Sequence, residues 1–178
     1  MKKYLALLRG INVGGKNKVE MKSLKTVFED AGFTEVSTYI NSGNIIFKST
    51  EDDEAKIASK IKSVLRDAFG FEIQIIIRSD SNIRKLARMI PDDWQNDGVQ
   101  KTDVLFLWDD YDNKKSLSLI KQAKNIDNVL YAKGAIIWNI LVKDYGKSGM
   151  NKFVGSKLYK NMTARNVNTV RKLAGLMS

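Results

Sequence analysis

Residues 4–18 of the chain read YLALLRGINVGGKNK, an apolar run followed by a loop rich in glycine and cationic side chains. The apolar run at 4–8 indicates a buried strand. In the loop, Gly10, Gly14 and Gly15 allow the backbone to take positive φ and leave its N–H groups uncovered. Bare amides beside cationic side chains form concavities that favour an anion. The stretch therefore predicts a first strand and, directly after it, a candidate anion-binding loop.

Composition limits the possible chemistry. The chain has 178 residues, of which 43% are hydrophobic, and it contains no histidine and no cysteine. Its length fits one domain or two small lobes. Without histidine or cysteine, Ser-His-Asp and Cys-His catalytic groups, ordinary zinc sites and disulfide scaffolds are all excluded. Acid–base chemistry would depend on Asp, Glu, Lys or Tyr, and we expect no metal site and no cofactor.

Two further features concern location. No apolar run is long enough for a transmembrane helix. The basic start, Met1-Lys2-Lys3, resembles a signal peptide, but its apolar stretch ends at Arg9 with no cleavage-like segment. We therefore expect a cytoplasmic protein that does not bind a membrane.

The net charge of +10 is concentrated at the two ends of the chain. Residues 1–27 contain seven lysines and arginines and one acidic residue, a net +6. Residues 143–178 contain eight and one, a net +7, whereas residues 28–142 contain fifteen and eighteen, a net −3. If the ends meet in space they form one positive surface; otherwise the charge only keeps the surface solvated.

The first half of the sequence alternates between two periodicities. Helical spacing of apolar residues at 21–31 and 57–69 predicts two helices, each followed by a glycine. Residues 36–40, 45–47 and 72–78 predict strands, and the turn at 41–44 joins the first two as a hairpin. With the strand at 4–8, the order is β-α-β-β-α-β, a ferredoxin-like split βαβ unit.

The second half partly repeats that order. We expect a short helix from Asp80 or Ser81 to Ile90, a strand at 103–108 buried on both faces, and a helix from Asn113 or Ser116 to about residue 124. A hairpin at 129–142, a partly helical stretch at 145–160 and a final helix capped by Thr163 follow. The predicted fold class is α+β, with two ferredoxin-like subdomains of mainly antiparallel sheet at residues 1–79 and 80–178.

The glycine loop also fits the start of a P-loop pattern, in which four residues separate Gly10 from Gly15-Lys16. Asn17 stands where the magnesium-binding Ser or Thr should follow, and predicted hairpins interrupt the parallel order of P-loop enzymes. We therefore discount a true P-loop. Two interpretations stay open: a different kind of anion loop, or a tight connection whose lysines are only solvated.

Other candidate ligand-binding residues lie in the turn at 41–44 and near the last helix. In a split βαβ unit, Arg9 at the end of one strand and Asn44 at the start of another share one rim of the sheet, so Ser42 and Asn44 are candidates to orient a ligand. Tyr39 before the turn fits either a stacking role or the core.

Arg165 in the predicted first turn of the last helix is unfavourable to the helix dipole, unless it and Asn166 hold an anion there or Arg165 pairs with a carboxylate. A loop cluster of Asp109, Asp110 and Asp112 fits a solvated acidic turn better than a cation site.

Three motifs together resemble one family. They are LRGINVGGK at 8–16, TYINSGN at 38–44 and TARNVNTV at 163–170, and they are similar to the domain-of-unknown-function 1697 family of bacterial proteins. The resemblance implies two subdomains related to the ferredoxin fold, and it implies no activity, substrate or cofactor. The family often has an aromatic residue where this chain has Val167, so the resemblance supports no stacking role there.

The leading functional hypothesis is binding of a phosphate-bearing ligand or nucleic acid through a basic cleft. Its candidate residues are Arg9, Asn12, Gly14, Gly15, Lys16, Ser42, Asn44, Arg165 and Asn166. An enzyme acting on a small phosphorylated molecule, with Lys16 or Tyr39 carrying the proton, is one alternative. An interaction module for an acidic protein partner is the other. The sequence predicts no oligomeric state.

Overall fold

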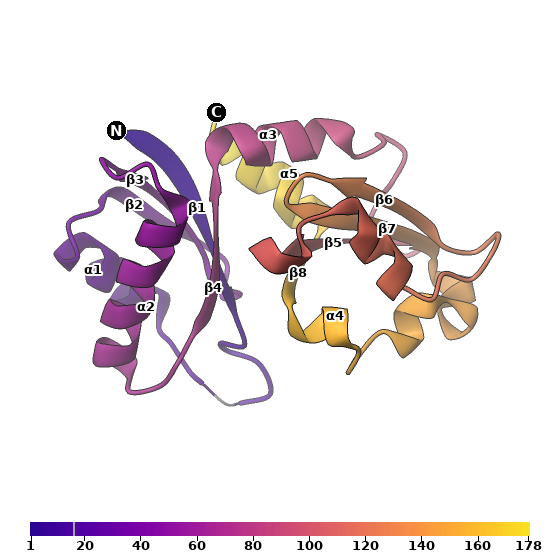
Figure 1. Cartoon of the computed structure of the whole chain (residues 1–178), viewed down its shortest axis with the longest axis horizontal. Coiled ribbons are helices and arrows are strands. Elements are labelled where there is room, and N and C mark those ends of the chain that lie inside the picture. Colours follow the sequence, from indigo (N-terminus) through magenta and orange to yellow (C-terminus); the bar gives the residue numbers. More distant parts are fainter. Residues whose placement is uncertain (16) are drawn as a thin grey trace. The chain divides into compact units, whose positions relative to one another are not determined.

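A computed structural model describes residues 1–15 and 17–178 of the chain. They form two compact units, one of Met1–Ser81 with Met177 and the other of Asn82–Leu176 with Ser178 (Figure 1). Each unit has a four-stranded antiparallel sheet with flanking helices. The predicted α+β class with two antiparallel subdomains is confirmed.

The first unit has six elements: β1 (Lys2–Arg9), α1 (Met21–Asp30), β2 (Thr34–Tyr39), β3 (Asn44–Ser49), α2 (Glu54–Phe69) and β4 (Gln74–Ser79). Its strand order is β2-β3-β1-β4. That is the order of a split βαβ fold, as the sequence predicts. Since β1 is central and antiparallel to β3, the loop after Arg9 and the turn before Asn44 lie at the same edge of the sheet.

The helices of the first unit cover one face of its sheet. Tyr4, Ala6 and Leu8 of β1 pack with Leu24 and Phe28 of α1 and with a stripe of α2 in one buried cluster. Leu5 and Leu7 point to the opposite face, because side chains alternate along a strand. Both are also fully buried, so β1 is covered on both faces.

Local signals set the limits of α2. The side chain of Asp53 accepts hydrogen bonds from the backbone N–H groups of Ala55 and Lys56, at 2.8 and 3.2 Å. Gly70 ends the helix at φ +76° in the left-handed conformation, which costs glycine little. The predicted helix at this place is confirmed.

The second unit begins with α3 (Asp80–Met89), which starts at the junction, and β5 (Gln100–Leu107). The 3₁₀ helices η1 (Asp109–Tyr111) and η2 (Lys114–Leu119) lead to the hairpin of β6 (Asn128–Ala132) and β7 (Ala135–Leu141). Then come η3 (Val142–Lys147), η4 (Gly149–Lys152), α4 (Lys157–Lys160), β8 (Met162–Asn166) and α5 (Val167–Leu176). The strand order, β6-β7-β5-β8, repeats that of the first unit.

The central strand of the second unit is buried on both faces, as its continuous apolar sequence predicts. Leu105 and Leu107 belong to a cluster with Trp138 of β7 and with residues of η4 and α4. Val104 and Phe106 point the other way and are fully buried too. Helix α5 contacts β5 and the edge strand β8.

The prediction that Thr163 caps the last helix is wrong. Thr163 lies inside β8 and pairs with Phe106 of β5. Helix α5 begins four residues later, where the side-chain oxygen of Asn166 accepts a hydrogen bond from the backbone N–H of Thr169 at 2.9 Å. Thr163 and Asn166 are both good capping residues, and pairing with β5 selects the second.

The helix predicted from Asn113 or Ser116 to about residue 124 is also wrong in type and extent. The segment forms only the 3₁₀ helix η2. Asn113 precedes it without a side-chain cap, while the hydroxyl of Ser116 donates to the carbonyl of Tyr111 at 2.6 Å. A serine bonded back to the chain in this way competes with α-helical hydrogen bonding.

Every helix among the described residues is too short or too polar to cross a membrane.

Candidate functional site

The loop after β1 has an unusual backbone. Gly10, Gly14 and Gly15 have φ of +77°, +61° and +75°, and the non-glycine residues Asn12 and Asn17 have φ of +55° and +51°. Asparagine tolerates this left-handed region better than most residues. All three glycines thus have the positive φ that the sequence predicts. A Cβ added at any of them would have no heavy atom within 4 Å, so glycine is needed there for its backbone conformation and not for space.

Hydrogen bonds within the loop close it on itself. The backbone N–H of Asn12 donates to the carbonyl of Asn17 at 3.1 Å, and the side-chain amide of Asn17 donates to the carbonyl of Gly10 at 3.1 Å. Ile11 is buried and anchors the loop. Lys16, a predicted ligand residue, lies outside the described residues.

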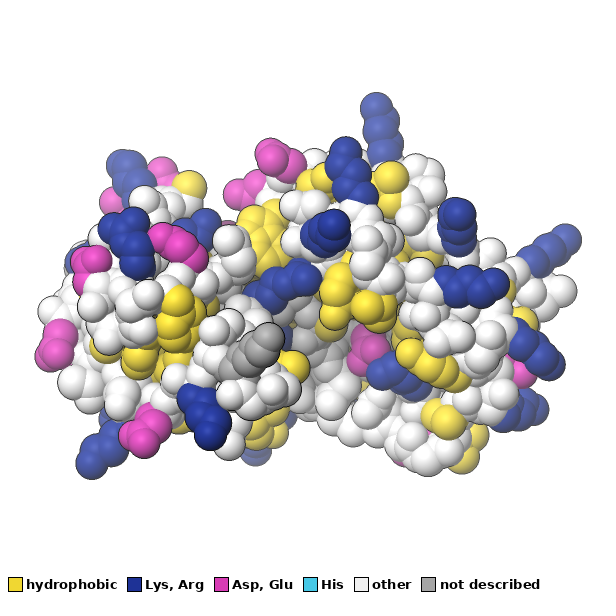
Figure 2. Space-filling model, turned by 90° about the horizontal axis from the view of Figure 1, so that it is seen from below, with side chains coloured by type: hydrophobic (Ala, Val, Ile, Leu, Met, Phe, Trp, Pro, Cys, Tyr) yellow, Lys and Arg dark blue, Asp and Glu magenta, His cyan; other side chains and the backbone are white. Residues whose placement is uncertain are grey.

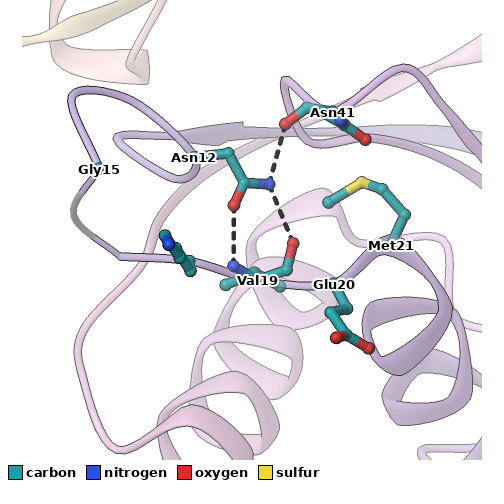
Figure 3. A pocket seen from close by; sticks show the side chains of 7 residues that line it. Asn12, Gly15, Val19, Glu20, Met21 and Asn41 are labelled. Carbon is teal, nitrogen blue, oxygen red and sulfur yellow. Dashed lines mark hydrogen bonds between the residues drawn. The ribbon is translucent and has the colours of Figure 1, made fainter.

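The side chain of Asn12 braces the loop against its neighbours (Figure 3). Its oxygen accepts from the backbone N–H of Val19 at 2.8 Å, and its amide donates to the carbonyls of Val19 and Asn41 at 2.9 and 3.0 Å. Asn12 therefore links the glycine loop to the segment before α1 and to the β2–β3 turn. The sequence analysis predicts a different role for this side chain, the orientation of a ligand.

The β2–β3 turn is held equally firmly. The buried amide of Asn44 donates to the carbonyl of Tyr39 and to the hydroxyl of Ser42, both at 2.9 Å. The carbonyl oxygen of Gly43 accepts a hydrogen bond from the N–H of Leu8 in β1 at 2.8 Å. Ile40 sits at φ +51° although it is β-branched, a costly conformation that only a constrained turn maintains.

A pocket of about 690 Å³ opens between the glycine loop, the start of α1 and the β2–β3 turn. Of the predicted ligand residues, Asn12 and Gly15 line it. Lys18, Val19, Glu20, Met21 and Asn41, which the sequence analysis did not single out, complete the lining. The structure thus brings together the two motifs at 8–16 and 38–44.

The start of α1 in the pocket wall lacks a side-chain cap. Glu20 occupies the N-cap position without a capping hydrogen bond, and no acidic residue lies in the first turn. The first N–H groups of a helix have no partner inside the helix and carry a partial positive charge. Glutamate is a poor N-cap, so this missing cap was a signal available in the sequence.

Four predicted ligand residues of the first unit lie outside this pocket lining, namely Arg9, Gly14, Ser42 and Asn44. Arg9 is half-buried at the end of β1, opposite Gln74 of β4. Asn44 is fully buried within the turn. The exposed Gly14 continues the loop next to Gly15.

Arg165 and Asn166 belong to the second unit. The guanidinium of Arg165 is buried in β8 and donates to the hydroxyl of Thr163 at 3.0 Å and to the carbonyl of Ala164 at 2.8 Å. Burial lowers the pKa of Arg165 to about 10, so the side chain is protonated at neutral pH. Because these residues lie in a strand, Arg165 is not in a helix first turn as the sequence interpretation places it.

The aspartates at 109–112 do not act as a group. Asp112 accepts hydrogen bonds from the hydroxyl of Tyr131 at 2.9 Å and the N–H of Gly134 at 2.7 Å, and it pairs with Lys133 at 2.6 Å. It therefore fastens the β6–β7 hairpin. Within residues 1–15 and 17–178, no group of three or more acidic side chains is placed to hold a metal ion.

Comparisons with known proteins agree with this architecture. The chain is similar over 99% of its length to 99% of a solved structure described as the conserved bacterial protein SP0830 from Streptococcus pneumoniae, with 28% identity and a TM-score of 0.86. The comparison with curated proteins gives no match. The family model described as protein of unknown function (DUF1697) matches residues 1–138, which include Met1–Ser81 of the first unit and most of the second sheet. The chain therefore belongs to the DUF1697 family.

Proposed function

We propose that this protein binds a small phosphate-bearing ligand in the pocket beside the glycine loop. The observation that carries the proposal is the pocket itself: a loop with five residues at positive φ and the uncapped start of α1 face one hollow. Loops of this kind and helix N-termini are the two backbone devices that most often hold phosphate.

The volume supports a small ligand. Pockets for small molecules usually measure about 300–1,000 Å³, and this one measures about 690 Å³. Space of that size suits a nucleotide or a sugar phosphate. A long nucleic acid would need a groove extending beyond these residues.

The charges in the pocket are mixed, and their placement matters. Lys18 lines it with one positive charge and Glu20 with one negative charge. Figure 3 shows the Glu20 carboxylate on the side of its chain away from Asn12 and the loop. A phosphate would therefore be recognised on the loop side, by backbone N–H groups with Lys18 nearby.

The test is an NMR titration of the ¹⁵N-labelled protein with inorganic phosphate, adenosine monophosphate and a short single-stranded RNA. We expect the amide signals of residues 12–21 to shift on adding adenosine monophosphate. Lys18→Gln should weaken that binding about tenfold, because a hydrogen bond to a charged group contributes roughly 1.5–3 kcal/mol. Lys56→Gln, which removes the same charge from α2 outside the pocket, is the matched control.

The outcomes separate the alternatives. If the amide signals shift only on adding RNA, and the affinity falls steeply with salt, the protein binds nucleic acid and not a small ligand. Unchanged signals for residues 12–21 with every phosphate compound would remove the pocket as a phosphate site. Equal losses in the Lys18 and Lys56 variants would leave only general electrostatic attraction.

A further inference from the structure

A second pocket in the second unit is lined by residues of helices α3 and α5. Figure 1 labels both helices. Its volume is about 420 Å³. Arg84 and Arg88 of α3 line one side, and Arg171 with Gly175 of α5 lines the other. Asp92 is the acidic side chain in the lining. Ala87, Ala174 and Ser178 complete the lining, so three guanidinium groups and one acidic side chain surround this small hollow.

The arginines are placed by the two helices. Arg84 and Arg88 are four residues apart on α3, so they lie on the same face of that helix. Ile83 and Leu86 of α3 are buried, which fixes the orientation of this helix. Val170 and Leu173 do the same for α5. The two rigid helices thereby hold the cationic side chains around the hollow.

Arg171 is fixed more firmly than a surface arginine. It donates to the carbonyl of Pro91 at 3.0 Å and to the side-chain oxygen of Gln95 at 3.2 Å. Both acceptors are neutral, so these bonds orient the guanidinium without cancelling its charge. A guanidinium has five N–H groups, and the remaining ones stay available for another acceptor.

Arg171 and Arg88 take part in no ion pair among the residues that the structure describes, since neither arginine lies within 4.0 Å of a carboxylate oxygen there. Arg88 is exposed and Arg171 half-buried. A dianionic group could therefore approach both without displacing an ion pair of theirs.

Small side chains keep the hollow open. Ala87 and Gly175 are part of its lining. Gly175 lies within α5, where glycine costs about 1 kcal/mol relative to alanine, and an added Cβ would meet nothing within 4 Å. Neither positive φ nor close backbone packing requires glycine at position 175. Because glycine has no side chain, the pocket stays open in front of this residue.

From this geometry we infer that the α3–α5 pocket is a second anion site, which takes a phosphate or diphosphate group. Arginine matches the geometry of phosphate oxygens with paired N–H groups. A volume of about 420 Å³ fits a compact phosphate compound. The inference is independent of the glycine-loop pocket, because its residues all belong to the second unit.

The experiment is a titration of the full chain with inorganic pyrophosphate, followed by calorimetry and by amide NMR signals. Binding should shift the signals of residues 84–92 and 171–176. Arg88→Gln should weaken it about tenfold, and Asp92→Asn should strengthen it severalfold. Lys85→Gln is the matched control, because it removes one positive charge from the exposed neighbouring position on α3, and it should change affinity less than twofold.

A charge-neutral variant tests the pocket itself. Gly175→Leu should abolish binding by filling the hollow while leaving all three arginines. Adenosine diphosphate as a second probe identifies the source: affinity equal to that of pyrophosphate indicates recognition of the phosphates alone, and tighter binding indicates a nucleotide.

Two results would overturn the inference. Equal weakening by Arg88→Gln and Lys85→Gln would reduce the effect to diffuse charge. The other is unchanged NMR signals near α3 and α5, together with a lower melting temperature in Arg88→Gln. That pair of results would assign the arginine to balancing the negative carboxyl end of α3.

Discussion

At the scale of single residues, Gly43 lies close both to Leu8 of the sheet and to Ile11 of the glycine loop. It has φ +74°, and an added Cβ would lie 2.8 Å from Leu8 Cβ and 2.8 Å from Ile11 Cδ1. We expect Gly43→Ala to lower the free energy of unfolding by about 3 kcal/mol, combining backbone strain with overpacking.

Gly70 provides the comparison for that prediction. It has almost the same φ, +76°, with nothing within 4 Å of an added Cβ. Gly70→Ala should therefore cost only the backbone term, about 1 kcal/mol. Urea denaturation of both variants measures the difference, and equal losses would mean that the approach of Leu8 and Ile11 to Gly43 carries no energetic weight.

The hydrogen bonds of Asn12 predict that this side chain stabilises the glycine loop. Its side chain takes part in three hydrogen bonds that connect three segments. Asn12→Ala should lower stability by roughly 2–3 kcal/mol, since each bond contributes about 1 kcal/mol. Asn12→Asp keeps the bond from the N–H of Val19 and loses the two donated bonds, so its loss should be intermediate. Thermal melting of both variants would contradict the bracing role if neither differed from wild type by more than 0.5 kcal/mol.

Asp112 should make the stability of the fold depend on pH in the acidic range. Burial alone would raise its pKa, but the hydrogen bonds from Lys133, Gly134 and Tyr131 outweigh burial and lower the pKa below 3.8. A carboxylate with a lowered folded pKa adds stability above its unfolded pKa and loses it as pH falls through the folded value. Between pH 4 and pH 2 the melting temperature should therefore fall less steeply in Asp112→Asn than in wild type. Identical slopes would show that Asp112 does not contribute to acid unfolding.

At the scale of elements, the uncapped start of α1 connects stability to ligand binding. Aspartate is a good N-cap and glutamate is not. Glu20→Asp should stabilise the protein by about 0.5–1 kcal/mol. If the free N–H groups hold phosphate, the same change should weaken phosphate binding, because the new cap competes for them while the charge is unchanged. Glu20→Gln removes the charge without adding a cap and should not weaken binding. A stabilised Glu20→Asp protein with unaltered affinity would exclude the α1 N-terminus from the site.

The sequence specified the elements whose signals are local. The apolar runs at 4–8 and 104–107, the glycine after each early helix and the turn at 41–44 all led to correct elements, because period and turn chemistry act within a few residues. Thr163 failed for a different reason. Its segment is a strand because β5 offers it a partner about sixty residues earlier, and no pattern within the segment contains that information.

Only the part of the candidate site that has a local signal could be predicted from the sequence. The glycines at 10, 14 and 15 mark a loop with positive φ, and the structure has that loop. The roles of Asn12 and Asn44 as braces depend on carbonyls that the fold brings to them. The α3–α5 pocket was not predicted, because Arg84 and Arg171 are 87 positions apart in the sequence, and only the tertiary fold places them at one hollow.

At the scale of the whole molecule, positive charge is concentrated at the two ends of the chain. We propose that this charge attracts nucleic acid. Residues 143–178 carry a net +7, and lysine and arginine side chains project over the face in Figure 2. Such a surface attracts any polyanion, whichever pocket holds the specific ligand. A specific site and a general attraction differ in their dependence on salt.

The last prediction uses that difference, with single-stranded RNA as the polyanion. If Arg9, Lys16 and Arg165 each contact a phosphate of the RNA, as the sequence hypothesis has it, the logarithm of affinity should fall linearly with the logarithm of salt concentration. Changing all three to glutamine should reduce the slope by about 0.7 for each lost contact. Arg165 is charged at neutral pH, because its pKa is about 10, and it is buried, so circular dichroism must first show that the triple variant folds. The control variant, with Lys56, Lys85 and Lys172 changed to glutamine, loses the same charge from exposed helical positions. Equal slopes for the two variants would show that the basic ends attract nucleic acid only by net charge, and would leave the two pockets as the places where a phosphate is recognised.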